Sequence, residues 1–377
     1  MLASPLFLCA QSADQPAPAT AASNEHTSWW RGITYDGLLS FSYTYNTNDP
    51  IPPLNQFRVF DFNDNQPQID VGQLVIQHAV SNPGQFGFRV DFVAGQGVPE
   101  VTASYGMFRN NETGKGQFYD LPQFYLSYIV PVGKGLRLDG GRFVTPLGYE
   151  VIGGYDGYND NFSRGFTQTG VRASYPFTGR ISAAILLTNG CDAVKDLNGS
   201  LTVVGELNVA TSQTTNLTAN YLHGPQQPHN AHDQRAVYEV DGTWKLIPPL
   251  QLAIDGLYAD EDHAAQDGSD AIWKGLAGYA KYAFAPHFSL ALRGEVFADP
   301  SGARTGIPQT LRGFTLTPEY VTAANFSRLK PELKHFDGKF VIRGELRQDF
   351  SDVNSFSRGS GYTNRQFTTA VNLIYLF

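Results

Sequence analysis

The sequence lacks the long apolar run that a membrane-spanning helix requires. Such a helix needs about 18 to 20 consecutive apolar residues, and no stretch of the 377 residues comes close. This absence does not exclude transmembrane strands, because a strand crosses a membrane with about ten residues of alternating polarity. Cysteine is scarce as well. Only Cys9 and Cys191 are present, far apart, so we expect neither a disulfide framework nor a paired-cysteine metal site.

Signatures of common enzymes are also missing. The sequence contains no Gly-x-Ser-x-Gly, His-Glu-x-x-His or Walker motif, and no Gly-x-Gly-x-x-Gly follows an expected strand. Three of the eight histidines, His223, His229 and His232, share a loop with Asp233, but such loops are more often polar surface than metal sites. We therefore expect no catalytic residue, no cofactor and no metal. A net charge of -8 argues against a nucleic-acid partner.

Charged residues make up only 16% of the chain, whereas glycine and aromatic residues are abundant, with 38 Gly, 19 Tyr and 26 Phe. Aromatic side chains favour strands, and residues that favour helices are comparatively few. The composition therefore predicts an all-β protein.

The few charges fall on one face of the expected strands. Near the C-terminus, Arg343, Glu345, Arg347 and Asp349 alternate with largely apolar residues, so these side chains point to one side. A soluble sandwich would also alternate, with its charges facing bulk water. Three features favour a transmembrane barrel instead. The other face is apolar over many strands, its ends are aromatic, as in residues 33–45, and no helix is available to cover it.

Turn signals set the number of strands. Seven short turns and eight longer polar stretches predict sixteen strands, with a range of about 14–18, in an antiparallel up-and-down barrel. Short turns would face the periplasm and long loops the exterior. Residues 309–335 are ambiguous, since they fit one strand with an insertion or two strands.

A closed sheet of about sixteen strands is wide enough to hold water. The inward charges would keep the wall rigid and wet, and would also set a transverse field that selects solutes by charge. The expected pore-lining residues are Arg89, Asp91, Arg137, Asp139, Arg142, Arg172, Glu239, Asp241, Arg293, Glu295, Arg343, Glu345, Arg347 and Asp349.

The last twelve residues, Gln366 to Phe377, alternate apolar side chains and end on an aromatic residue. This pattern resembles the terminal strand of bacterial outer-membrane barrels. The resemblance implies that Leu373, Tyr375 and Phe377 form the signal read by the barrel-assembly machinery. At the other end, residues 1–13 resemble the back of a signal peptide, and residues 14–29 form a Pro/Ala/Ser-rich linker. We expect residues 30–377 to form a single barrel domain.

A more specific resemblance lies in residues 140–176. The motif Gly-Arg-Phe-Val-Thr-Pro-Leu-Gly-Tyr-Glu at 141–150 is followed by Asn-Asp-Asn-Phe-Ser-Arg at 159–164 and Gly-Val-Arg-Ala-Ser-Tyr-Pro at 170–176. This series resembles the OmpL-like family of outer-membrane β-barrel porins, loosely over the whole expected barrel. The resemblance implies a channel in the bacterial outer membrane, without naming its solute.

The loop between these motifs carries Glu150, Tyr155, Asp156 and Asp160, with Arg142 and Arg164 on either side. By analogy with general porins, we expect the loop to fold inward and narrow the channel. In this hypothesis the acidic residues face Arg142, Arg164 and Arg172 across the constriction. The alternative is a loop that stands in solvent.

Three functions remain. We favour a porin for passive diffusion of small hydrophilic solutes or ions. A substrate-selective channel for sugars or anions is the alternative, since Tyr149, Tyr155 and Tyr158 could stack on sugar rings. An outer-membrane enzyme would need a serine, a histidine and a carboxylate at one rim, for which the sequence gives no reason. Expected partners are outer-membrane lipid, lipopolysaccharide, the barrel-assembly machinery and small solutes. The sequence does not distinguish a monomer from a homotrimer.

Overall fold

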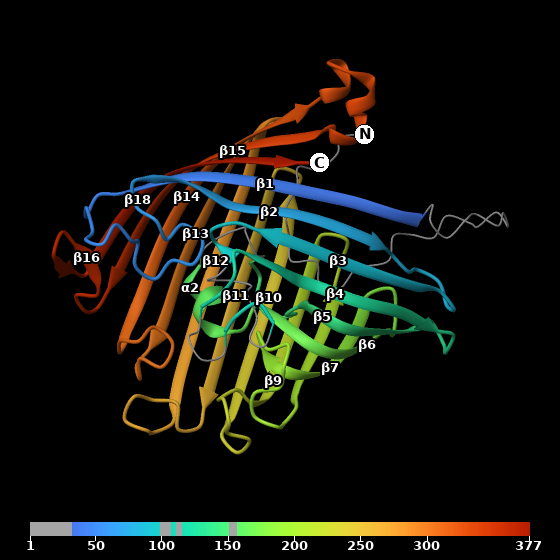
Figure 1. Cartoon of the computed structure of the whole chain (residues 1–377), viewed down its shortest axis with the longest axis horizontal. Coiled ribbons are helices and arrows are strands. Elements are labelled where there is room, and N and C mark those ends of the chain that lie inside the picture. Colours follow the sequence, from blue (N-terminus) through green and yellow to red (C-terminus); the bar gives the residue numbers. More distant parts are fainter. Residues whose placement is uncertain (1–31, 99–106, 111–114, 151–156) are drawn as a thin grey trace.

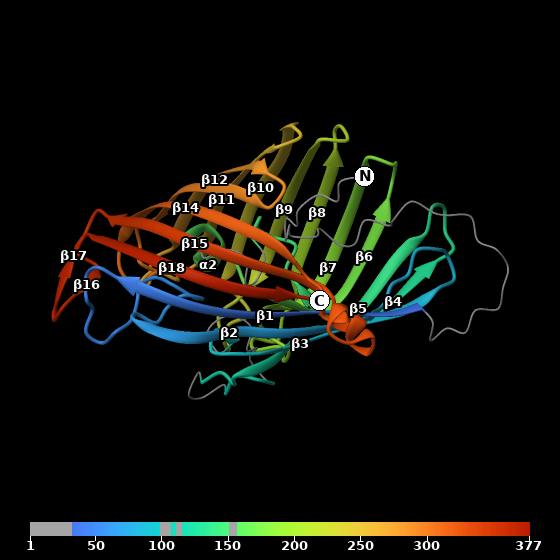
Figure 2. The same cartoon turned by 90° about the horizontal axis from the view of Figure 1, so that it is seen from above.

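The chain forms a closed barrel. The computed structural model describes residues 32–98, 107–110, 115–150 and 157–377, so the expected signal remnant and linker lie outside the described residues. Within this part, sixteen strands pair antiparallel with their neighbours, and the last pairs with the first (Figures 1 and 2). The predicted fold class is therefore confirmed. The strands are β1 (Ile33–Asn46), β2 (Gln66–His78), β3 (Phe86–Ala94), β4 (Tyr119–Val130), β5 (Leu136–Val144), β6 (Thr167–Pro176), β7 (Ile181–Cys191), β8 (Thr202–Ala210), β9 (Thr215–Pro225), β10 (Gln234–Ile247), β11 (Leu250–Glu261), β12 (Ala271–Ala285), β13 (Phe288–Asp299), β14 (Gln309–Ala324), β15 (Gly338–Ser351) and β18 (Arg365–Leu376).

Short and long connections alternate, so the barrel has a short-turn end and a long-loop end. Helix α2 (Tyr158–Ser163) and a hairpin, β16 (Phe356–Arg358) and β17 (Gly361–Thr363), belong to two of the long loops. At the short-turn end, β14 leads into two 3-10 helices, η2 (Phe326–Arg328) and η3 (Pro331–Phe336). The ambiguous residues 309–335 thus contain one strand and an insertion. No helix in the described ranges is long and apolar enough to cross a membrane.

The outer face of the barrel is apolar and the inner face polar. In β1, Leu39, Phe41 and Tyr43 are more than 40% exposed, whereas Ser40 and Ser42 between them are buried. Such alternation is what a strand needs when lipid contacts one face and a polar interior the other.

Tyrosines gather on the outer face toward the long-loop end of neighbouring strands. The rings of Tyr221 on β9 and Tyr238 on β10 lie 4.9 Å apart, and Tyr258 on β11 follows at 6.5 Å. All three are exposed. Amphipathic rings in this position form the aromatic girdle at a membrane interface.

The barrel closes where the chain ends. The backbone N–H of Gly37 donates to the carbonyl of Phe377 at 2.9 Å, and the N–H of Phe377 returns a bond to Gly37 at 3.0 Å. The ring of Phe377 lies over Gly37, in the space that a side chain there would occupy. An aromatic ring that covers a strand glycine excludes water and pins the register.

Replacing Gly37 with valine should therefore destabilise the closure by about 1–3 kcal/mol, the usual cost of overpacking. The measurement is the temperature at which the compact folded band of the protein disappears on a detergent gel. Gly278→Val is the matched control, because Gly278 also lies in a strand and a Cβ there meets no atom within 4 Å. Equal melting temperatures for the two variants would contradict the role of this contact.

Candidate functional site

The connection between β5 and β6 covers residues 145–166, and we call it the inner loop. Its described residues, 145–150 and 157–166, lie inside the barrel. Its helix α2 contacts β11, β12 and β13, and strands surround it in Figure 1. Residues 151–156, which include the predicted Tyr155 and Asp156, lie outside the described residues. The described parts of the loop take up space in the interior that water would otherwise fill.

Carboxylates of the barrel wall hold the start of α2. Glu295 on β13 accepts hydrogen bonds from the backbone N–H groups of Tyr158, at 2.6 Å, and Asn159, at 3.4 Å. The side-chain amide of Asn159 donates to Asp255 on β11 at 2.6 Å. These groups are buried. Two strands of the wall therefore fix the orientation of the helix through charge-assisted bonds.

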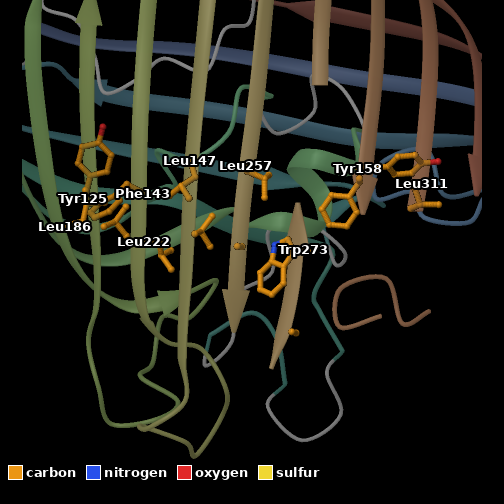
Figure 3. Close-up of a cluster of buried hydrophobic side chains, with 14 of the residues drawn as sticks. Tyr125, Phe143, Leu147, Tyr158, Leu186, Leu222, Leu257, Trp273 and Leu311 are labelled. Atoms are coloured by element: carbon orange, nitrogen blue, oxygen red, sulfur yellow. The ribbon is translucent and has the colours of Figure 1, made fainter. Parts of the chain in front are cut away.

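An apolar belt on the inner wall forms a second anchor. Inward side chains of strands β7 to β12 meet in register, and Leu147 and Tyr158 of the inner loop belong to the same cluster (Figure 3). Phe162 packs against it. Leu147 and Tyr158 are at most 1% exposed. The loop is therefore seated on a small hydrophobic core inside the barrel. The belt consists of Leu186, Val204, Leu222, Val237, Ala259, Trp273, Phe297 and Leu311.

Trp273 on β12 joins this belt to the charged parts of the loop. Its indole N–H donates to the carbonyl of Ser163 at 3.2 Å. The guanidinium groups of Arg304 and Arg235 lie 5.1 and 5.5 Å from the centre of its ring, within the range of cation–π attraction. Trp273 thus hydrogen-bonds the end of α2 and contacts two cations through its ring.

Glu150 has a different cationic partner from those predicted. Its carboxylate accepts from Arg293 on β13 at 3.1 Å and from the hydroxyl of Tyr279 at 2.9 Å. The sequence prediction placed Arg142, Arg164 and Arg172 opposite Glu150 and its acidic neighbours. Of these, Arg164 does pair with Asp160 and also donates to the backbone carbonyl of Glu150 at 2.9 Å. The other two have nearer carboxylates: Arg142 pairs with Asp120 at 2.6 Å, and Arg172 with Asp139 at 2.8 Å.

Burial shapes the charge of the inner loop. It raises the pKa of the Asp160 carboxyl to about 7, while the neighbouring Arg164 opposes the rise. Burial also raises the pKa of Glu150, and Arg293 opposes it. Each arginine thus helps keep its carboxylate charged in a site that has lost most of its water.

The predicted ladders of charges two residues apart are partly present. Arg89 pairs with Asp91 at 2.8 Å, and Arg137 with Asp139 at 2.9 Å. Within the other ladders, Arg347 bonds Asp349 at 2.8 Å and Arg293 lies 3.4 Å from Glu295. In β15, however, Arg343 bonds Glu319 of the neighbouring β14 at 2.8 Å. Glu345, which the prediction placed beside Arg343 on the same face of β15, is partly exposed.

Sequence reasoning missed Arg58, in the first long loop. Arg58 donates to Asp349 on β15 at 2.6 Å, and both side chains are fully buried. Beside it, the ring of Phe57 lies 6.3 Å from Phe162 of the inner loop and 5.5 Å from Phe356 of β16. Three long loops therefore meet inside the barrel. No local pattern around Arg58 signals this contact, because its partner lies 291 residues away.

Acidic side chains form a row on the wall of β8 to β11. Glu206 on β8 is level with Asn220 and Glu239, and Asp241 stands directly beside Asp255 on the next strand. Strands β8, β9 and β11 contain no Lys or Arg. No lysine or arginine of the described residues forms an ion pair with these four carboxyl groups, although other interior charges are paired. Asp241 stays partly exposed to the interior.

The predicted aromatic platform for sugars is reduced in the structure. Tyr158 is fully buried in the belt. The ring centres of Tyr149 and Tyr279 lie 4.6 Å apart with the rings tilted by 48°, and both residues line a recess together with Lys281 and Arg293. Of the predicted rings in the described residues, Tyr149 thus reaches the recess beside two cations, although it is only 7% exposed.

Comparisons with known proteins agree with this architecture. The family model described as "Putative beta-barrel porin-2, OmpL-like" matches residues 32–377. A comparison with curated proteins finds no match. Among solved structures, the outer membrane channel DcaP of Acinetobacter baumannii is similar, with 10% identity and a TM-score of 0.58 over 92% of this chain and 97% of that chain.

Two further structures share the fold. The anion-selective porin from Comamonas acidovorans is 12% identical, with a TM-score of 0.55 over 92% of this chain and 99% of that chain. OmpT of Vibrio cholerae, solved in a trimer form, is 10% identical, with a TM-score of 0.55 over 92% of this chain and 99% of that chain. At these identities the likeness establishes the barrel and not the solute.

Proposed function

Because the chain belongs to the OmpL-like porin family and to the bacterial outer membrane, we propose that it forms a water-filled channel for passive diffusion of small hydrophilic solutes, with a preference for cations. The short-turn end then faces the periplasm. The inner loop is the constriction in this proposal. Solutes pass the described parts of the loop and the acidic row on the wall of β8 to β11.

The acidic row supports the cation preference. Interior arginines pair with nearby carboxylates, whereas no lysine or arginine of the described residues forms an ion pair with Glu206, Glu239, Asp241 or Asp255. A pore lined by one sign of uncompensated charge attracts ions of the opposite sign. The runner-up is a channel for anions or sugars, which the recess of Tyr149, Lys281 and Arg293 favours.

The test is the reversal potential across a planar bilayer in a potassium chloride gradient. We expect a sign that corresponds to cation preference. Asp241→Asn combined with Glu206→Gln should lower the cation-to-anion permeability ratio roughly thirtyfold. Each of the two charges, about 8 Å from the ion path in water, stabilises a cation and destabilises an anion by about 0.5 kcal/mol. An anion preference in the unmodified protein would refute the proposal.

A charge-matched control separates the local field from net charge. Asp196→Asn with Asp267→Asn also removes two carboxylates, but from the long loops connecting β7 to β8 and β11 to β12. This variant should keep the original permeability ratio. If both variants lower the ratio equally, the acidic row is not its source.

The assembly is part of the same proposal. A trimer form is recorded for the similar OmpT of Vibrio cholerae, which supports a homotrimer here. The acidic row faces the interior of each barrel, so the predicted selectivity does not depend on the number of subunits. Lipopolysaccharide, phospholipid and the barrel-assembly machinery complete the proposed partners.

A further inference from the structure

The connection between β14 and β15, residues 325–337, takes no part in the interior. We call residues 326–336 the rim segment. It contains η2 and η3 and lies at the periplasmic end, beside the C-terminus (Figures 1 and 2). With thirteen residues, the connection is much longer than the hairpin between β10 and β11, where Pro248 and Pro249 alone separate the strands. A tight hairpin would have sufficed to connect the strands.

Aromatic contacts place the rim segment on the outer surface of the barrel. Phe326 lies 6.2 Å from Phe340 and 5.6 Å from Tyr375, and Phe336 lies 6.3 Å from Phe377. The hydroxyl of Tyr375 donates to the carbonyl of Phe336. Phe340 and Tyr375 point outward, since the residues two positions along, Ile342 and Leu373, are exposed on the lipid-facing side. The segment therefore borders lipid and not the channel.

Polar bonds give the rim segment a defined shape. The backbone N–H of Ser327 donates to Asp337 at 2.8 Å, and its hydroxyl donates to the same carboxylate. Pro331 stands at the start of η3, a position that its fixed backbone angle favours. The two short helices are thus clamped together on the barrel.

The exposed side of the rim segment is both apolar and basic. Leu329 is 76% exposed and Phe336 49% exposed. Around them Arg328, Lys330 and Lys334 are also exposed, against one acidic residue within the segment, Glu332, and one directly after it, Asp337. Exposed apolar side chains among cations are typical of segments that lie at a membrane surface, with the apolar groups at the acyl boundary and the cations at phosphates.

We propose that the rim segment is a docking site for anionic phospholipids of the periplasmic leaflet. Two observations select this occupant. The site continues the lipid-facing surface formed by Phe340 and Tyr375, and its three cations complement an anionic headgroup. Leu329 and Phe336 enter the boundary between headgroups and acyl chains, while Arg328, Lys330 and Lys334 bind the phosphate.

The test measures lipid preference of the full chain in phosphatidylcholine vesicles. Spin-labelled phosphatidylglycerol and spin-labelled phosphatidylcholine are compared by the fraction that the protein immobilises. We expect the unmodified protein to favour phosphatidylglycerol roughly fivefold, the effect of about one basic side chain at an anionic surface. The triple variant Arg328→Gln, Lys330→Gln, Lys334→Gln should reduce this preference to near unity, with an unchanged single-channel conductance.

The matched control removes three other exposed cations from the same end of the barrel: Lys134→Gln and Arg180→Gln in two short connections, and Lys245→Gln near the end of β10. It should retain the preference for phosphatidylglycerol. Equal loss in both triple variants would mean that net charge, and not this site, attracts the lipid. No preference in the unmodified protein would also overturn the proposal and would favour a periplasmic protein as the occupant.

Discussion

Replacing Tyr158 with alanine is expected to release the inner loop from the wall and to raise the single-channel conductance severalfold. The ring is fully buried in the apolar belt, and the guanidinium of Arg347 lies 4.8 Å from its centre. Removing a buried aromatic side chain costs about 3–5 kcal/mol. Because the loop is held inside the barrel by such contacts, most of that loss should appear as a population with the loop undocked.

The control for this prediction is Tyr158→Phe, which keeps the ring in the belt and the backbone bond to Glu295. Its conductance in planar bilayers should match that of the unmodified protein. Partial release in the alanine variant would appear as added current noise between two levels. An unchanged, quiet conductance in Tyr158→Ala would show that the inner loop does not limit the current.

The variant Asp349→Ala should lower the free energy of unfolding by about 3–5 kcal/mol, because two buried cations lose the carboxylate that they share. Each keeps one more distant or more exposed carboxylate: Arg58 lies 2.9 Å from Asp61, and Arg347 lies 3.6 Å from Glu295. Asp349 accepts from Arg347 at 2.8 Å and from Arg58 at 2.6 Å, and all three side chains are fully buried. Urea-induced unfolding in lipid vesicles, followed by tryptophan fluorescence, measures the loss.

Asp270→Ala provides the comparison, since Asp270 is exposed at the end of a long loop. Substitutions at such surface positions usually change stability by less than about 0.5 kcal/mol. A similar small loss for Asp349→Ala would show that Asp61 and Glu295 are sufficient partners for Arg58 and Arg347, and would contradict the expected role of Asp349.

The barrel could be predicted from the sequence because lipid imposes a strict rule on each strand. Ser40 and Ser42 face in while Phe41 faces out, and a side chain on the wrong face would leave a polar group in hydrocarbon. The same rule, applied to Arg343, Glu345 and Arg347, identified the inward face of β15. Turn residues then gave the strand number, because each hairpin connection is local.

The interior was harder to predict because its contacts join distant segments. Glu150 pairs with Arg293, 143 residues away, and no local spacing distinguishes this arginine from Arg142 or Arg164. The apolar belt did leave a signal. Ile185, Leu186 and Leu187 are consecutive, so one of them must face inward, but an interior expected to be wet gave no reason to look for a hydrophobic core.

The packing of Phe336 on Phe377 and of Phe326 on Tyr375 has a consequence for the order of steps in barrel assembly. If the assembly machinery binds the final strand through the rings of Tyr375 and Phe377, as their pattern implies, it must dissociate before the rim segment can pack on those rings. In the finished barrel the rim segment then covers part of the rings of Tyr375 and Phe377, while Leu373 stays exposed, so the assembled strand presents less of its terminal pattern than the unassembled one.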